Sequence, residues 1–270
     1  MRKTIVYIFM VIAGSLATYA GPTGEVMDSV LVVSREVKRI GSYAYRDRVD
    51  IAEVRFEDAS ELTSIGDYAF LGCSNLRRII LPSGLRTLGE GSFRECGSLE
   101  SITIPDGVSK LPGYLFYWCE NLRDVKLPMW LESIGRSCFA YCRNLREIPR
   151  LIGLKNIGMN AFSRCESLRE VWLGKRVKSL ESYAFSDCVN LRKISFPPNS
   201  SELGELILSG CERLEEIEQM SVVPPKFECN SFLFEPDEEE LYSRVRVVVP
   251  ASARGAYRRA HGWRLFKRID

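Results

Sequence analysis

The fold is decided by residues 76–96, which read LRRIILPSGLRTLGEGSFREC. In the first seven residues Ile79 and Leu81 alternate with Arg78 and Ile80, which predicts a strand with the first pair inward, ended by Pro82. Residues 85–89 predict a second short apolar segment. Residues 90–96 predict a compact helical turn that directs a phenylalanine into the core.

This pattern recurs every 23 residues. An apolar residue, mostly followed by glycine, stands at Ile65, Leu88, Leu111, Ile134, Ile157, Leu180 and Leu203. The same spacing carries Phe70, Phe93, Phe116, Phe139, Phe162 and Phe185. It also carries Cys73, Cys96, Cys119, Cys142, Cys165, Cys188 and Cys211. One unit cannot bury these side chains alone, so we expect a repeat solenoid of about eight coils, right-handed, with equivalent residues stacked at the ~4.8 Å strand spacing.

The repeats resemble the BspA-type leucine-rich repeats of bacterial surface proteins, whose consensus reads L-x-x-I-x-L-P and then L-x-x-I-G-x-x-A-F-x-x-C-x-N-L. The resemblance covers roughly residues 37–220. It implies a leucine-rich-repeat right-handed solenoid of short parallel strands, turns and short helices. Beyond it, residues 245–250, Tyr257, Trp263 and Phe266 resemble the strand-Pro-helix-Trp tail of that family. We expect this tail to form a small strand-helix cap, with its helix at residues 252–261.

The first twenty residues have the features of a signal peptide. Arg2 and Lys3 are basic, residues 4–13 are apolar, and Ala20 ends a small-residue cleavage site. An uncleaved membrane anchor is the alternative, but the apolar run ends at Gly14, short of the ~20 residues that a span needs. We therefore expect a secreted, periplasmic or cell-surface protein with no stable membrane span in the mature chain.

These features divide the chain into four segments. They are a signal peptide (1–20), an N-terminal capping segment with a degenerate repeat (21–64), the repeat array (65–220) and a C-terminal cap (221–270). The acidic run Glu235 to Glu240 is predicted to be a solvated loop.

Charge is balanced in the predicted mature chain. The whole chain has 37 basic and 35 acidic residues, and the leader holds two of the basic ones and none of the acidic ones. A formal net charge of zero argues against a nucleic-acid binder, which would usually be strongly basic.

Nine cysteines in an exported chain would normally suggest disulfides. Seven of them share one column of the repeat, and Cys138 falls in a column of small residues, so we expect buried thiols that are largely reduced. One or more bridges between neighbouring coils remain the alternative, although parallel Cβ vectors suit a disulfide poorly. Cys229 has no assigned role.

The sequence offers little material for catalysis. The single histidine, His261, lies in the proposed cap, and there is no Cys-x-x-Cys pair. The strict 23-residue spacing also leaves no room for an insertion with a catalytic set. We therefore expect a protein that is not an enzyme, with no metal site and no cofactor.

Binding is expected on the outward strand positions, which form a ladder in a solenoid. One column reads Ile80, Thr103, Lys126, Pro149, Trp172, Ser195 and Glu218. An exposed Trp172 is a candidate anchor for a bound ligand. The alternative is that its ring packs on Lys126 or Arg169 as surface cover.

A second column holds four consecutive arginines, Arg123, Arg146, Arg169 and Arg192, which we call the arginine stripe. Guanidinium groups match carboxylate and sulfate geometry, so the stripe is a candidate site for an acidic protein or glycan. Pairing with Asp124, Glu147 and Glu170 across the rungs is the alternative, and the more favoured of the two.

The candidate ligand-binding residues are Trp172, Lys126, Ile80 and the arginine stripe. The resemblance implies a protein ligand, including adhesion to host or neighbouring-cell proteins. The alternative is a carbohydrate-binding surface protein, which would prefer several exposed aromatic residues in a row, whereas this ladder shows one.

Overall fold

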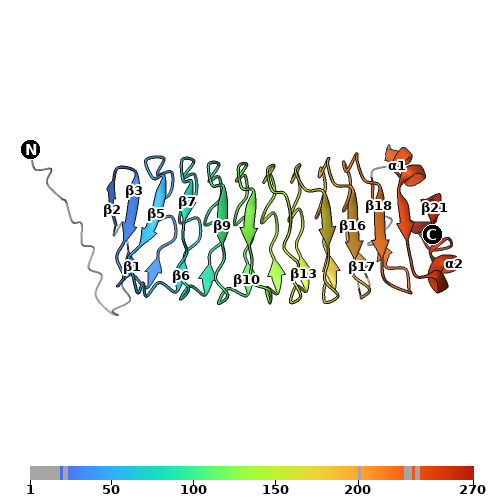
Figure 1. The fold of residues 1–270 in the computed structure, drawn as a ribbon, viewed down its shortest axis with the longest axis horizontal. Coiled ribbons are helices and arrows are strands. Elements are labelled where there is room, and N and C mark those ends of the chain that lie inside the picture. Colours follow the sequence, from blue (N-terminus) through green and yellow to red (C-terminus); the bar gives the residue numbers. More distant parts are fainter. Residues whose placement is uncertain (1–18, 21–23, 200–201, 228–232, 235–237) are drawn as a thin grey trace, which may run out of the picture.

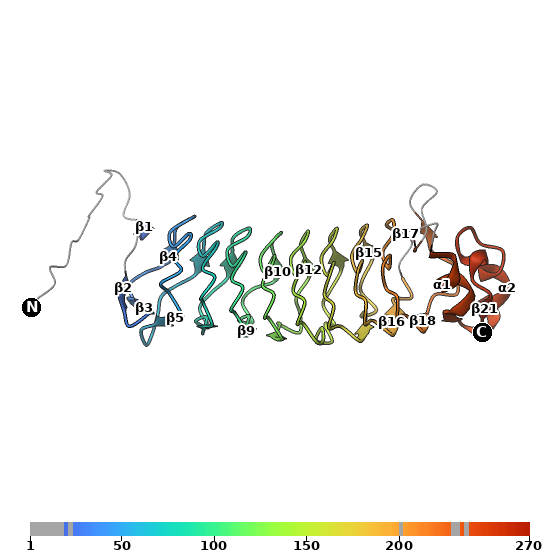
Figure 2. The same ribbon diagram turned by 90° about the horizontal axis from the view of Figure 1, so that it is seen from above.

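The computed structural model describes residues 19–20, 24–199, 202–227, 233–234 and 238–270. The chain winds into a long solenoid whose coils stack side by side from the N-terminal hairpin to the C-terminal cap (Figures 1 and 2). The predicted repeat solenoid of short parallel strands is confirmed. It has about ten coils, because segments on both sides of the strict repeats also add strands.

Most coils contribute strands to two columns. The first column, which we call the strand face, contains β3 (Val30–Val33), β5 (Glu53–Phe56), β7 (Arg78–Ile79), β9 (Ser101–Thr103), β11 (Asp124–Lys126), β14 (Glu170–Trp172), β16 (Lys193–Phe196), β18 (Glu216–Gln219), β20 (Arg246–Val248) and β21 (Arg268–Ile269). The second contains β1 (Tyr19–Ala20), β4 (Arg39–Ile40), β6 (Ser64–Ile65), β8 (Thr87–Leu88), β10 (Lys110–Leu111), β12 (Ser133–Ile134), β13 (Asn156–Ile157), β15 (Ser179–Leu180), β17 (Glu202–Leu203) and β19 (Lys226–Phe227).

Pairing within both columns is parallel and in the register of the repeat. Val171 lies opposite Ile194 on the strand face, and Ile134 opposite Ile157 in the second column. The strand around Ile79 shows the expected alternation: Ile79 is buried while Ile80 is 64% exposed. The hydrophobic column therefore faces the core in each coil.

A spine of phenylalanines fills the core, as the repeat predicts. The six rings are at most 1% exposed. Their centroids are 5.2 to 5.8 Å apart from Phe70 to Phe185, and Tyr45 extends the stack at 5.1 Å. Each ring is covered by its equivalents in the neighbouring coils, so no coil can lose its ring without exposing two others.

The third corner of each coil contains turns, and the predicted helical turn at residues 90–96 is wrong. Gly91 and Glu95 have φ of 55° and 61°, in the left-handed region, which interrupts a right-handed helix. The N–H of Phe93 donates to the Leu115 carbonyl of the next coil (3.1 Å). The corner is thus a third hydrogen-bonded ladder along the solenoid, which a helix bonded within its own coil could not supply.

The cysteine column has a structural role at this corner. Each thiol donates to the carbonyl of the aromatic residue in the preceding coil, as Cys142 Sγ does to Phe116 O (3.1 Å) and Cys165 Sγ to Phe139 O (3.2 Å). All eight described cysteines, Cys138 included, are free and buried, and burial raises their pKa. These contacts favour the reduced ladder over bridges; Cys229 lies outside the described residues.

Repeated glycines allow adjacent coils to approach closely. A Cβ on Gly89 would clash with the Asp67 backbone nitrogen of the preceding coil. Glycine recurs at this position in most coils, whereas Pro112 and Glu181 occupy it in two others.

Different devices close the two ends of the core. At the N-terminal end β2 (Gly24–Met27) pairs antiparallel with β3. At the C-terminal end β20 and β21 extend the strand face, and Tyr257 and Trp263 are fully buried. Trp263 Nε1 donates to the Pro225 carbonyl (3.0 Å), which anchors the cap to the last coil.

The short helices are η2 (Ala251–Ala253), α2 (Arg254–Tyr257), η3 (Trp263–Leu265) and α1 (Glu239–Arg244). The predicted cap helix at 252–261 is therefore shorter, with a 3-10 turn at its start. Helix α1 begins inside the acidic run that was predicted to be a loop. It forms because Leu241 and Tyr242 are buried, and two glutamates in its first turn favour the helix dipole.

Most of the predicted signal peptide lies outside the described residues. Tyr19 and Ala20 form β1, which pairs with β4, so cleavage after Ala20 would remove that strand. No helix among the described residues is both long and apolar enough to cross a membrane.

Candidate binding surface

The strand face presents the predicted rungs unevenly. Ile80, Thr103 and Lys126 are exposed, whereas Pro149, Trp172 and Glu218 are half-buried. Ser195 is buried, so its predicted outward exposure is wrong. It lies in register between Trp172 and Glu218, and its short side chain is shielded by these larger neighbours.

The ladder is also interrupted at two places, the first of them between β7 and β9, which belong to different sheets. Residues 147–149 form no strand, and the strand face divides there between β11 and β14. Pro149 has no backbone N–H to donate to a neighbouring strand, which accounts for the break. The predicted continuous ladder is therefore three segments, β3 to β7, β9 to β11 and β14 to β21, with Trp172 at the edge of the third.

Trp172 has a partner that the sequence analysis did not identify. The Arg150 guanidinium lies over its ring, 5.3 Å from the centroid. Packing of the ring on Lys126 or Arg169 stays a prediction. The half-buried ring remains a possible anchor, but one that already carries an arginine on one side.

The arginine stripe is exposed along its length. Arg123, Arg146 and Arg169 make no ion pair with any described residue, and Arg192 pairs with Glu215 at 3.5 Å. Among the described residues, the expected pairs with Asp124, Glu147 and Glu170 are missing too. Three unpaired guanidinium groups on successive coils are free to meet an external carboxylate.

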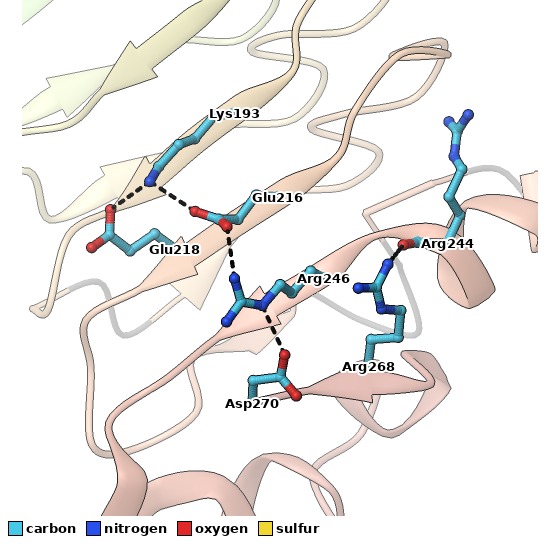
Figure 3. Close-up of polar contacts among 7 residues, drawn as sticks. All are labelled: Lys193, Glu216, Glu218, Arg244, Arg246, Arg268 and Asp270. Carbon is cyan, nitrogen blue, oxygen red and sulfur yellow. Dashed lines mark hydrogen bonds and ion pairs between the residues drawn. The ribbon is translucent and has the colours of Figure 1, made fainter.

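The C-terminal end of the same face is arranged in the opposite way (Figure 3). Lys193 Nζ lies 2.7 Å from Glu216 Oε1 and 3.8 Å from Glu218 Oε2. Arg246 bridges Glu216 (3.4 Å) and Asp270 (2.7 Å), and its hydrogen bond lowers the pKa of the Asp270 carboxyl. Charges at this end neutralise each other, whereas the three unpaired arginines leave the middle coils of the same face open to an acidic partner.

A cluster of aromatic rings that the sequence analysis did not identify lies at the turn corner. Trp118 stacks on Tyr141 at 4.9 Å, and Tyr117 meets both rings edge-on. Arg164 covers Tyr141 at 5.3 Å. Trp118 and Tyr141 stand 23 residues apart, and that spacing could have indicated their stacking. Each ring therefore packs on a neighbour, while Trp118 stays 42% exposed.

Among the described residues, no group of three or more histidine, cysteine, aspartate or glutamate side chains is placed to hold a metal ion. The lone histidine lies in the cap, far along the chain from the cysteine column, and burial of the thiols raises their pKa. The residues that carry distinctive chemistry are therefore surface cations and aromatic rings.

Comparison with known families agrees with this geometry. A family model described as the BspA type leucine rich repeat region matches residues 38–155 and 151–232, in six copies. The chain belongs to the BspA-type leucine-rich repeat family. The match includes every coil that carries the arginine stripe and Trp172, so both lie within the BspA-type array.

Solved structures of leucine-rich repeat proteins are similar to this BspA-type chain. The leucine-rich repeat protein of T. pallidum is 22% identical with a TM-score of 0.50, over 74% of this chain and 78% of that one. A leucine-rich cell surface protein of Faecalibacterium prausnitzii is 19% identical with a TM-score of 0.43, over 80% and 82%. The first supports the fold. A search of the curated proteins finds no match.

Proposed function

We propose that this protein is a non-catalytic, exported or cell-surface binding protein that holds an acidic face of another protein along its arginine stripe. The observation that carries the proposal is the trio Arg123, Arg146 and Arg169, exposed on successive coils and unpaired. Fifteen ion pairs among the described residues engage charges elsewhere on the surface and leave this trio out. Unpaired cations at a regular spacing suit a partner that supplies carboxylates.

Two further features support an exported binding protein. The leader-like N-terminus favours export, and BspA-type repeats resemble those of bacterial surface proteins. Solenoids of this type are typically non-catalytic and offer extended surfaces to other macromolecules. Adhesion to host or neighbouring-cell proteins is the most specific form of the proposal.

Charge reversal tests the proposal. Residues 21–270 are immobilised as wild type, as Arg146→Glu with Arg169→Glu, and as Arg254→Glu with Arg259→Glu. The last pair is a matched control, because both arginines are exposed in the cap and make no ion pair among the described residues. Proteins retained from an extracellular extract are quantified by mass spectrometry.

The proposal predicts a set of acidic proteins that is lost on the stripe variant and kept on the cap variant. Retention of the same set on all three surfaces, with circular dichroism showing intact folds, would contradict it.

A further inference from the structure

A basic pocket lies away from the strand face, on the turns that join the two strand columns. It has a volume of about 290 Å³ and is lined by Lys155, Lys175, Arg176, Lys178 and Asn199. These residues come from three successive coils, and Lys155 and Lys178 occupy the same position of adjacent repeats. The solenoid thus converts a 23-residue spacing into a cluster of four cations.

Most of this charge is not neutralised by the protein. Lys155 pairs with Glu132 at 3.0 Å, whereas Lys175, Arg176 and Lys178 make no ion pair with any described residue. The residues that line the pocket include four basic side chains and no acidic one, in a chain whose totals nearly balance. Like charges held together repel one another, so the pocket favours an anion.

An exposed apolar strip borders the pocket. Trp130 is 62% exposed, and Arg176 of the pocket lies 5.7 Å from its ring centroid. Gly153 lies between Trp130 and Arg176 along the solenoid. A Cβ on Gly153 would lie 2.6 Å from the Trp130 backbone, so the coils are in close contact there. Met129 is 58% exposed and Ile152 is 40% exposed. They occupy equivalent positions of adjacent repeats, next to Trp130 and Gly153 in the chain. A ligand that fills the pocket can therefore also contact an aromatic ring.

Asn199 adds a neutral polar group. Its Nδ2 donates to the Lys175 carbonyl (3.0 Å), which orients the side chain. The amide oxygen is left as an acceptor, which suits a hydroxyl donor.

We propose that this pocket binds a sulfated glycan. The lysines and Arg176 meet sulfate groups, Asn199 accepts from a sugar hydroxyl, and a sugar ring packs on Trp130. An acidic peptide would satisfy the cations, and its backbone N–H groups would satisfy the amide oxygen, but the exposed ring of Trp130 beside the cations favours a sugar. The site is separate from the arginine stripe, so it extends the proposed function to a second class of ligand.

Heparin is the probe for the test, with binding to residues 21–270 measured by titration calorimetry at several salt concentrations. Lys175→Glu with Lys178→Glu is expected to weaken binding at least tenfold. The cap pair Arg254→Glu with Arg259→Glu is the matched control and should change affinity less than twofold. Trp130→Ala should weaken binding without altering its salt dependence, because the ring carries no charge.

Poly-L-glutamate, at the same concentration of negative charge, separates the ligand classes. Weaker binding of poly-L-glutamate than of heparin supports the proposal. Three results would overturn it: no heparin binding, equal loss in the pocket and cap variants, or poly-L-glutamate bound as tightly as heparin.

Discussion

The buried cysteine column should make this solenoid sensitive to alkali. The eight described thiols are buried, and burial raises the pKa of each thiol, that of Cys73 to about 12. In the unfolded chain a thiol ionises near pH ~8.5. Since the folded pKa lies above the unfolded one, the stability is fully present below that pH. It is lost as the pH rises toward the folded pKa, because the unfolded chain then releases protons that the folded chain retains.

The size of this effect follows from the same two pKa values. Each thiol that stays protonated in the folded chain lowers the free energy of unfolding by about 1.4 kcal/mol at pH 9.5, relative to neutral pH. For eight thiols the effect is roughly 11 kcal/mol, similar to the total stability of a typical domain, about 5–15 kcal/mol. The figure is an upper bound, because coils of a repeat array can unfold separately.

Urea titration under strongly reducing conditions at pH 7.5, 8.5 and 9.5, followed by circular dichroism, measures the effect. The unfolding midpoint should fall steeply over this range. A variant with Cys96→Ala, Cys119→Ala and Cys142→Ala should show a shallower pH dependence, by about three eighths, whatever its stability at pH 7.5. Equal midpoints at pH 7.5 and 9.5, or an unchanged pH dependence in the variant, would refute the reasoning.

Three other predictions follow from the core and the strand face. Phe139→Ala should lower the free energy of unfolding by about 3–5 kcal/mol, because it removes a buried ring stacked between Phe116 and Phe162; a loss below about 1 kcal/mol in denaturant titration would argue against the spine. Thiol counting with a chromogenic disulfide reagent should find the column unreactive in the native protein and nine thiols after denaturation without reductant; markedly fewer would indicate bridges. Trp172→Ala should weaken a captured protein partner by about 2 kcal/mol if the ring is part of a binding hot spot, with little change in the unfolding midpoint; unchanged affinity would move the site away from this ring.

The sequence predicts the core well because the buried positions recur with the 23-residue repeat. Phe139 and Val171 each have equivalents 23 residues away, and these can be buried only by stacking on one another. The turn corner was missed for a physical reason. Trp118 and Tyr141 adopt left-handed φ of 63° and 65°, which their residue types disfavour and which only the hydrogen bonds between coils enforce.

Surface contacts were less predictable because they join different columns. Arg150 reaches Trp172 from a position outside the predicted rungs, and Ser195 is buried by the size of its neighbours. The basic pocket had a visible signal, since Lys155 and Lys178 are one repeat apart. Its remaining members come from neighbouring positions, so their convergence emerges only in three dimensions.

The most direct test of binding along the arginine stripe is a hydrogen-exchange footprint of the protein with a captured partner. The proposal predicts slower exchange, on partner binding, in residues 123–126, 146–150 and 169–172, with the cap strands β20 and β21 unchanged. Protection confined to the turn corner or the cap, with these three segments unaffected, would contradict binding at the stripe.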